Sequence, residues 1–331
     1  MARESAITKV TSFESFSVSM TSHAKEAGEV WPFVDLPDWS VRAQNLAELT
    51  KSYAILYTPI VETDQRQDWE SYVKNNVQSW YLESIINENL SVNVTDLYTM
   101  ENIFALDITT NPPVSKPLEN DTAPWLPVWQ VYPLDPTFTT VNFNFLNGPR
   151  LNQAYNILRY TKKPALNFVQ TPEGGRSQIL TPIFDKVNNG KVELEMVGAI
   201  WALYEWSSYF ENILTDETAE QLNLVVKNSC HEEDDVTYSV KGPDVSFLGY
   251  GDLHDTKFDD LEVNAPFLVI DYDQDKVPGD LCTPTVSLFL YPTKEMKQSF
   301  QTNTAAVYTS LIVVCIVYIV PLLICFCLSL F

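Results

Sequence analysis

Apolar side chains in the N-terminal part of the chain recur at three- and four-residue steps, which is the spacing of amphipathic helices. Residues 5–29 are predicted to form one helix that ends near Gly28, before a Trp-Pro-Phe turn. A second helix is predicted after Pro37, and its stripe comprises Leu46, Leu49, Tyr53, Leu56 and Ile60. A third is expected after a cap at Thr63 or Asp64, with the stripe Trp69, Val73, Val77 and Trp80.

From Leu97 onward the pattern changes to short apolar runs separated by Pro, Asn and Gly, which indicates strands. The predicted strands are 103–108, 128–132, 141–145, 179–184, 192–204, 223–227, 236–240, 267–272 and 285–291, with helices at 151–160 and 206–214. We therefore predict an α+β fold in which long N-terminal helices pack on a mixed, mainly antiparallel sheet. This order of elements is typical of sensor domains of the PAS, Cache or CHASE kind.

The end of the chain is apolar without interruption. No charged side chain follows Lys297, and residues 305–331 are long enough to cross the hydrocarbon core as one helix. The predicted organisation is thus an N-terminal helix (1–30), an extracytoplasmic α+β sensor domain (31–298) and a transmembrane helix (305–331). The last strand is expected to continue through Pro292 into a helix at 294–301, so a shift of that strand would reach the membrane.

The side of the membrane does not follow from charge, because no Lys or Arg comes after the apolar stretch. The N-terminus lacks the apolar core of a secretory signal, which taken literally predicts a tail-anchored, cytosol-facing protein. A glycosylphosphatidylinositol signal is the other literal option, but it requires entry to the secretory pathway and a polar spacer before the tail, and neither is seen in the sequence. The glycosylation sequons at Asn89, Asn93 and Asn120 fit a luminal location instead.

Composition narrows the function. The 331 residues are 45% hydrophobic and 12% aromatic, enough for a sizeable core, and the net charge of −22 argues against nucleic acid as a partner. The chain has no phosphate-binding glycine loop, nucleophile elbow or histidine pair at metal-ligand spacing, so we expect no enzyme activity, cofactor or metal. Residues 271–275 imitate the start of a calcium loop, but the glycine and the bidentate glutamate of such a loop are missing.

Two sets of residues are candidates for ligand binding. The loop 249–255 contains two glycines beside Asp252 and His254, and it is either a polar binding rim or a structural turn. The aromatic residues Trp129, Trp201 and Tyr204 lie on predicted strands, where they either line a small-molecule pocket or pack in the core.

Three of the five cysteines lie in the apolar tail, which leaves Cys230 and Cys282 in the folded part. These two either form one disulfide in an oxidising compartment or remain two buried thiols.

Several segments, in order along nearly the whole chain, resemble the extracellular sensor regions of receptor-type adenylyl/guanylyl cyclases of diatoms and related algae. They are TSHA (21–24), WPFVDLPD (31–38), PVWQ (127–130), NFN (142–144), TPIFD (181–185), NSC (228–230), GYGDLHD (249–255) and YPTKEM (291–296). The resemblance implies a plasma-membrane receptor with its sensor domain outside the cell, a membrane crossing on each side of it and a cytoplasmic class III cyclase beyond. It also implies pairing of Cys230 with Cys282.

With this resemblance we expect a homodimer that binds an unidentified small molecule or peptide and transmits a shift through its last helix. The first crossing and the cyclase are not in this sequence, so we expect either a piece of a longer receptor or a receptor-like protein without an output domain. Cyclase activity is therefore not assigned to these residues. The alternative is a membrane-anchored interaction, adhesion or decoy protein with no small-molecule ligand.

Overall fold

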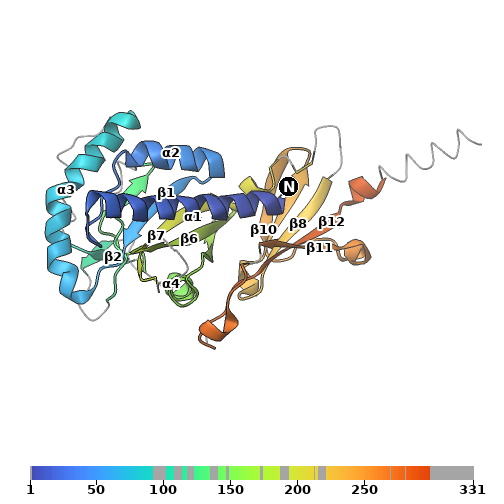
Figure 1. Ribbon diagram of the computed structural model, residues 1–331. Helices are drawn as coiled ribbons and strands as arrows, with labels where there is room; N and C mark the ends of the chain where they lie inside the picture. Colours follow the sequence, from blue (N-terminus) through green and yellow to red (C-terminus); the bar gives the residue numbers. More distant parts are fainter. Residues whose placement is uncertain are drawn as a thin grey trace, which may run out of the picture.

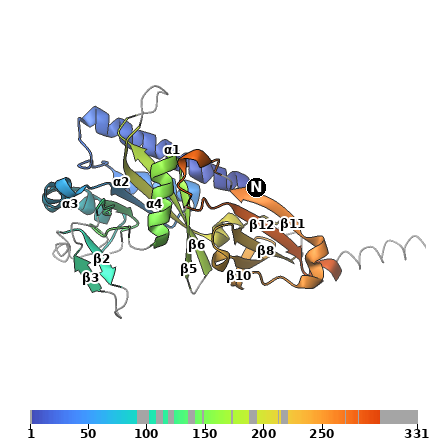
Figure 2. The same ribbon diagram turned by 90° about the horizontal axis from the view of Figure 1, so that it is seen from below.

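The computed structural model describes residues 2–91, 102–107, 114–117, 123–134, 141–146, 149–171, 174–186, 194–211, 213–214, 221–268, 270–279 and 281–298. Two antiparallel five-stranded sheets lie one after the other along the molecule, with helices gathered around the first (Figure 1, Figure 2). The helices are α1 (Ala2–Ala27), α2 (Trp39–Thr50), α3 (Arg66–Asn87) and α4 (Pro149–Thr161). The predicted α+β class is confirmed, but two sheets are present where one was predicted.

The first sheet has the strand order β4-β1-β7-β6-β5. Its strands are β1 (Ala54–Pro59), β4 (Gln130–Tyr132), β5 (Ala165–Thr171), β6 (Gly174–Phe184) and β7 (Met196–Glu205). The central strands are buried on both faces and are accordingly rich in Ile, Leu, Ala and aromatic residues. A small hairpin, β2 (Phe104–Asp107) with β3 (Val114–Pro117), accompanies this sheet.

The second sheet has the order β10-β9-β8-β12-β11. Its strands are β8 (Gln221–Asn228), β9 (Val236–Lys241), β10 (Asp244–Tyr250), β11 (Val263–Leu268) and β12 (Val286–Pro292). The strand β12 is a central strand between β8 and β11. Residues 294–298, which follow it directly, are helical, in agreement with the predicted exit from the last strand.

Helix α1 joins the two sheets. It lies along β6 and reaches β11, so its N-terminus is beside the second sheet (Figure 1). Its buried stripe follows the helical period and consists of Ala6, Lys9, Phe13, Ser17, Met20, Thr21 and Ala24. The hydroxyl of Ser17 donates to the Pro182 carbonyl (2.6 Å) and that of Thr21 to the Phe184 carbonyl (2.9 Å), which fixes the helix on β6.

The charged member of this stripe, Lys9, is only 2% exposed. Its Nζ donates to the Thr50 carbonyl (2.6 Å) and lies 4.3 Å from the ring centroids of both Tyr204 and Tyr209. Burial lowers the pKa of Lys9 to about 8, an effect that Glu211 partly opposes. The lysine thereby connects α1, the end of α2 and the 3-10 turn after β7.

Some predicted elements were wrong. The second helix ends at Thr50, where Lys51 takes a left-handed conformation (φ 60°), and the rest of its predicted stripe forms β1. That strand is buried on both faces, so its continuous apolar run also fits a helical spacing. The predicted helix 206–214 contains only a 3-10 turn, Trp206–Tyr209, and the predicted strand 141–145 forms isolated bridges.

The third helix is confirmed, and Trp69, Val73 and Trp80 of its predicted stripe are buried. It follows a 3-10 turn capped by Glu62 and Gln65, so its cap lies next to the predicted residues. Among the described residues no helix is both long and apolar enough to cross a membrane. The predicted transmembrane segment, 305–331, lies outside them.

Candidate functional site

Aromatic and acidic side chains from four separate parts of the chain meet where the turn between α1 and α2 covers the first sheet. We call Glu29, Asp35, Tyr57, Tyr72 and Trp129 the aromatic–acidic cluster. Tyr57 comes from β1, Tyr72 from α3, and Trp129 directly precedes β4. The two acids come from the turn itself.

The turn has a defined local cause. Gly28 takes a left-handed conformation (φ 72°) and ends α1, and the Glu29 amide donates back to the Ala24 carbonyl (2.9 Å). The backbone amide of Asp35 then donates to Glu29 Oε2 (3.3 Å). The end of the helix therefore places both carboxyl groups on the same side of the turn.

Gln130, a fully buried residue of β4, holds the turn against the sheet. Its Nε2 donates to Asp35 Oδ1 (2.7 Å) and to the Leu36 carbonyl (3.0 Å), and its Oε1 accepts from the Leu36 amide (3.1 Å). Because Gln130 is neutral, it orients the Asp35 carboxylate without neutralising it.

The electrostatics of the cluster are unfavourable to its own carboxylates. Burial, with smaller contributions from Glu29 and Glu83, raises the pKa of Asp35 from 3.8 to about 6. Among the described residues no lysine or arginine forms an ion pair with Asp35, and the nearest basic group to Glu29 is His23 Nε2 at 4.0 Å. Asp35 is thus ionised at neutral pH, and the described residues around it supply no ion-paired positive charge.

The aromatic rings form the wall of the cluster. The Trp129 ring centroid lies 5.4 Å from that of Tyr72, 5.6 Å from that of Trp69 and 5.7 Å from that of Trp80. Tyr57 lies between Trp31 and Trp39, each at 6.4 Å. Aromatic faces carry partial negative charge, so rings and carboxylates together favour a cation.

Three buried polar atoms at this place have no hydrogen-bond partner in the described structure: Tyr57 Oη, Trp129 Nε1 and Trp80 Nε1. Such an atom costs about 1–3 kcal/mol of stability. Burial raises the pKa of Tyr57, and Tyr72, Asp35 and Glu29 raise it further. It therefore stays neutral, with an oxygen free to accept a hydrogen bond from a ligand.

The structure brings only one of the three predicted aromatic residues into the cluster. Trp201 Nε1 donates to Thr58 Oγ1 (2.6 Å), and its ring packs 4.1 Å from that of Phe145. Tyr204 packs against Phe13 of α1 on the opposite face of β7. The described pockets lie elsewhere, near α4 and the β5–β6 hairpin, and Trp129, Trp201 and Tyr204 line none of them.

The other predicted binding residues, Asp252 and His254, lie in the connection between β10 and β11 of the second sheet, where their side chains contact each other and not the cluster. The remaining members of the cluster were missed because acidic and tyrosine residues 22 to 43 positions apart give no motif. The one usable signal was Asp35 itself, which lies inside the WPFVDLPD segment. Within the described residues no group of three or more His, Cys, Asp or Glu is arranged to hold a metal ion.

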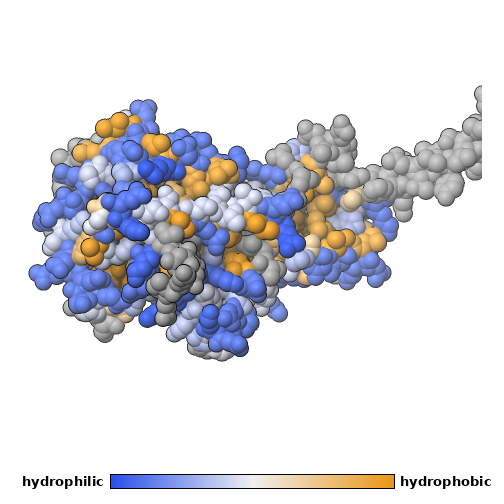
Figure 3. Space-filling model, viewed as in Figure 1, coloured by the Kyte–Doolittle hydropathy of each residue, from blue (hydrophilic) through white to orange (hydrophobic). Residues whose placement is uncertain are grey.

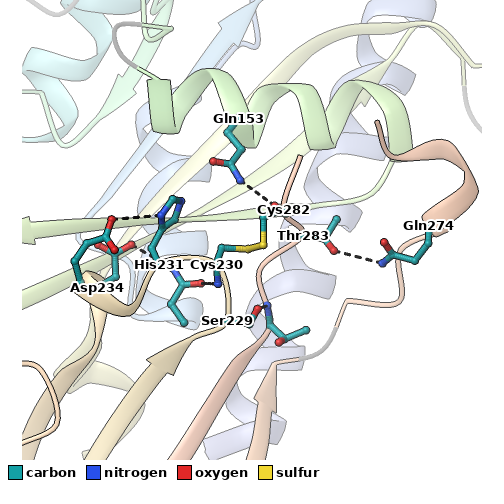
Figure 4. The surroundings of a disulfide bond; sticks show 11 residues. Gln153, Ser229, Cys230, His231, Asp234, Gln274, Cys282 and Thr283 are labelled. Atoms are coloured by element: carbon teal, nitrogen blue, oxygen red, sulfur yellow. Dashed lines mark hydrogen bonds and ion pairs between the residues drawn. A yellow bond between two sulfur atoms is a disulfide. The ribbon is translucent and has the colours of Figure 1, made fainter. Parts of the chain in front are cut away.

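Cys230 and Cys282 form a disulfide with an S–S distance of 1.99 Å (Figure 4). It joins the end of β8 to the segment before β12. Gln153 of α4 donates to the Cys282 carbonyl (3.0 Å), so the bridge also touches the first half of the molecule. Of the glycosylation sequons, Asn89 is exposed just after α3, whereas Asn93 and Asn120 lie outside the described residues.

No protein-family model matches this chain, and no curated protein has a significantly similar sequence.

Proposed function

We propose that this chain is the ligand-sensing module of a membrane receptor and that its aromatic–acidic cluster recognises a small organic cation, such as a primary or quaternary ammonium compound. The observation that carries the proposal is Asp35, a largely buried carboxylate beside two further acids and aromatic rings, to which no basic side chain in the described part of the chain is paired. A bound ammonium group would supply the missing charge, and the Trp and Tyr faces would hold its alkyl substituents.

The architecture supports a sensor. Numbered along the chain, the strands of the first sheet have the order 2-1-5-4-3, as expected of a PAS- or Cache-type sheet. The cluster lies between that sheet and the helices. The last strand, β12, leads directly into helical residues 294–298 and onward to the apolar stretch 305–331, for which we propose a membrane-spanning helix. A plasma-membrane homodimer with its folded part outside the cell is consistent with the resemblance to receptor cyclases.

Ligand recognition can be tested by thermal unfolding of the full chain in detergent micelles at pH 7.5. The probes are choline, phenethylamine and putrescine, each with a neutral analogue such as 3,3-dimethyl-1-butanol for choline. A ligand at 100 times its Kd stabilises by about 2.7 kcal/mol, which raises Tm by several degrees. We expect a cation to do this and its neutral analogue not to.

The matched variants are Asp35→Asn, which removes the charge at the cluster, and Asp244→Asn, which removes an exposed charge on an edge strand. Asp35→Asn should abolish the shift, and Asp244→Asn should retain it. If no cation raises Tm, or if neutral analogues are equally effective, cation sensing is wrong.

A second function, adhesion or interaction without a small-molecule ligand, is favoured by a different observation. Exposed apolar side chains gather on the second sheet and its connections, namely Leu248, Leu253, Leu261 and Val263. Hydrophobic surface is visible over that sheet in Figure 3. Failure of every probe in the thermal assay would leave this surface as the better candidate.

A further inference from the structure

The connection between β10 and β11 crosses one face of the second sheet, and we call residues 251–262 the crossover segment. The Leu253 amide donates to Thr237 Oγ1 of β9 (3.0 Å), and Thr237 donates to the Gly251 carbonyl (2.6 Å). Asp252, which lies between Gly251 and Leu253 in the chain, pairs with Lys227 of β8 (2.7 Å). The segment then reaches β12 through His254, so it touches three neighbouring strands in turn.

Gly249 and Gly251 make this path possible. Both have positive φ angles, 154° and 85°, which side chains other than glycine rarely adopt. A Cβ at Gly249 would also lie 2.8 Å from Leu253 Cδ1. The two glycines that made the loop a candidate rim in the sequence thus turn the chain back over the sheet.

Both ring nitrogens of His254 are held by carboxylates. Nδ1 is hydrogen-bonded to Asp252 Oδ1, and Nε2 to Asp259 Oδ1 (2.7 Å). A carboxylate only accepts, so each of these nitrogens must carry a hydrogen, and only the charged imidazolium has two. The geometry itself therefore specifies a protonated histidine.

The imidazolium ring lies flat on the last strand. Its centroid is 3.7 Å from that of Tyr291, with an angle of 3° between the planes. Tyr291 is 2% exposed, and its hydroxyl donates to Glu262 Oε2 (2.7 Å) at the end of the crossover segment. We call Asp252, His254, Asp259 and Tyr291 the His254 clamp.

The charged and titratable groups around the ring come from every element packed on it: Asp252, Asp259 and Glu262 from the crossover segment, Lys227 from β8 and Tyr291 from β12. The carboxylates outnumber the lysine. Burial lowers the pKa of His254, but its hydrogen bonds to Asp252 and Asp259 outweigh this and raise the pKa above 6.5. Burial acts to raise the pKa of Asp252, and the hydrogen bonds from His254 and Lys227 more than offset it, so this pKa is lowered.

The segment that carries the His254 clamp also contacts the helical residues 294–298, which follow β12. Asp259 belongs to a 3-10 turn, Thr256–Leu261, in which Phe258 is buried. The Nζ of Lys297, in the helical residues 294–298, lies 5.8 Å from the Phe258 ring centroid. The crossover segment therefore contacts both β12 and the residues that follow it.

We propose that His254 is a proton-binding site that fastens the crossover segment to the last strand, so that the proton is a second input to this molecule, separate from the aromatic–acidic cluster. When His254 loses its proton, one of its two carboxylates faces a bare ring nitrogen and is repelled. The segment then separates from β12, and the packing of Phe258 on residues 294–298 loosens with it.

The sign of the pH effect follows from the two pKa directions. A histidine whose folded pKa is raised contributes stability that is full below its unfolded pKa and is lost as pH rises through the folded value. The lowered pKa of Asp252 contributes stability that is lost as pH falls through that value. The clamp is thus closed in mildly acidic solution and opens at alkaline pH.

Amide hydrogen exchange of the full chain in detergent, at pH 6 and pH 9 and corrected for intrinsic rates, tests the proposal. We expect residues 251–262 and 286–292 to exchange at least about tenfold faster at pH 9, because hydrogen bonds between charged groups are lost. His254→Gln should show the fast rates at both values. His231→Gln, which changes another partly exposed histidine, should behave as the wild type.

A proton NMR titration of the wild-type histidines adds a readout that does not depend on how a variant folds. His254 should titrate above 6.5, and its pKa should fall in Asp259→Asn. A pKa at or below 6.5, or equal protection of the two segments at both pH values, would overturn the proposal. Because neither measurement uses a ligand, its result is independent of cation binding.

Discussion

Replacing Asp35 by asparagine should make the unliganded protein more stable at neutral pH while removing its response to cations. In the folded state the pKa of this carboxyl is raised from 3.8 to about 6, mainly by burial. Since one pKa unit corresponds to ~1.4 kcal/mol, ionising Asp35 costs the folded protein about 3 kcal/mol. Asparagine carries no charge and keeps an oxygen that can accept from Gln130 Nε2, so the turn should stay in place.

The effect has a defined pH dependence. A carboxyl whose folded pKa is raised contributes stability that is full below its unfolded pKa and is lost as pH rises through the folded value. The wild type should therefore lose stability relative to Asp35→Asn between about pH 4 and pH 6. Below this window the two proteins should have equal free energies of unfolding, and above it the variant should be more stable by about 3 kcal/mol.

The assay is urea unfolding of the full chain in detergent, followed by tryptophan fluorescence at several pH values between 4 and 8. Asp244→Asn is the control, because this exposed carboxyl lies on the edge strand β10. Taking differences between proteins at each pH cancels the titration of all other groups. A destabilised Asp35→Asn, or a difference that does not change across the window, would refute the electrostatic account of the cluster.

Three further predictions concern how the parts of the molecule are held together. Removing the Arg150 side chain should destabilise the protein by about 3–5 kcal/mol in urea unfolding, because its partner Asp234 is 2% exposed and would keep an unpaired charge. Replacing both Cys230 and Cys282 by serine should cost about 4 kcal/mol, since the bridge closes a sequence separation of 52 residues; reduction of the wild type should match the variant. Lys9→Met should stabilise by up to about 3 kcal/mol at pH 7, because burial lowers the pKa of Lys9 to about 8, and this advantage should shrink as pH rises from 8 to 10.5.

Helical spacing was the most informative pattern in the sequence where one face alone is buried. It located α3, whose buried stripe includes Trp69, Val73 and Trp80. The first helix was predicted from its end signal at Gly28, and the buried stripe of α1 follows the same 3.6-residue period. Helical spacing was wrong at β1, where all residues after the first are buried and apolar spacing no longer distinguishes a strand from a helix. The division into two sheets depends on pairings between distant strands, such as β8 with β12, which local patterns do not encode.

The members of the candidate site also depend on contacts between distant segments, which local sequence patterns do not encode. Trp129 was selected for being aromatic and near a strand, and it does belong to the cluster. Glu29, Asp35, Tyr57 and Tyr72 were not selected, because only the folded chain places their separate segments together. His254 was selected for its neighbours in sequence, yet its second partner, Asp259, and its stacking on Tyr291 depend on the crossover of the sheet.

The 26 residues of α1 have a consequence for how the molecule unfolds. Their contacts extend from β6 of the first sheet to β11 of the second, so neither sheet can melt while the other keeps its full packing. Calorimetry should therefore record a single endotherm in place of two, with van't Hoff and calorimetric enthalpies that agree.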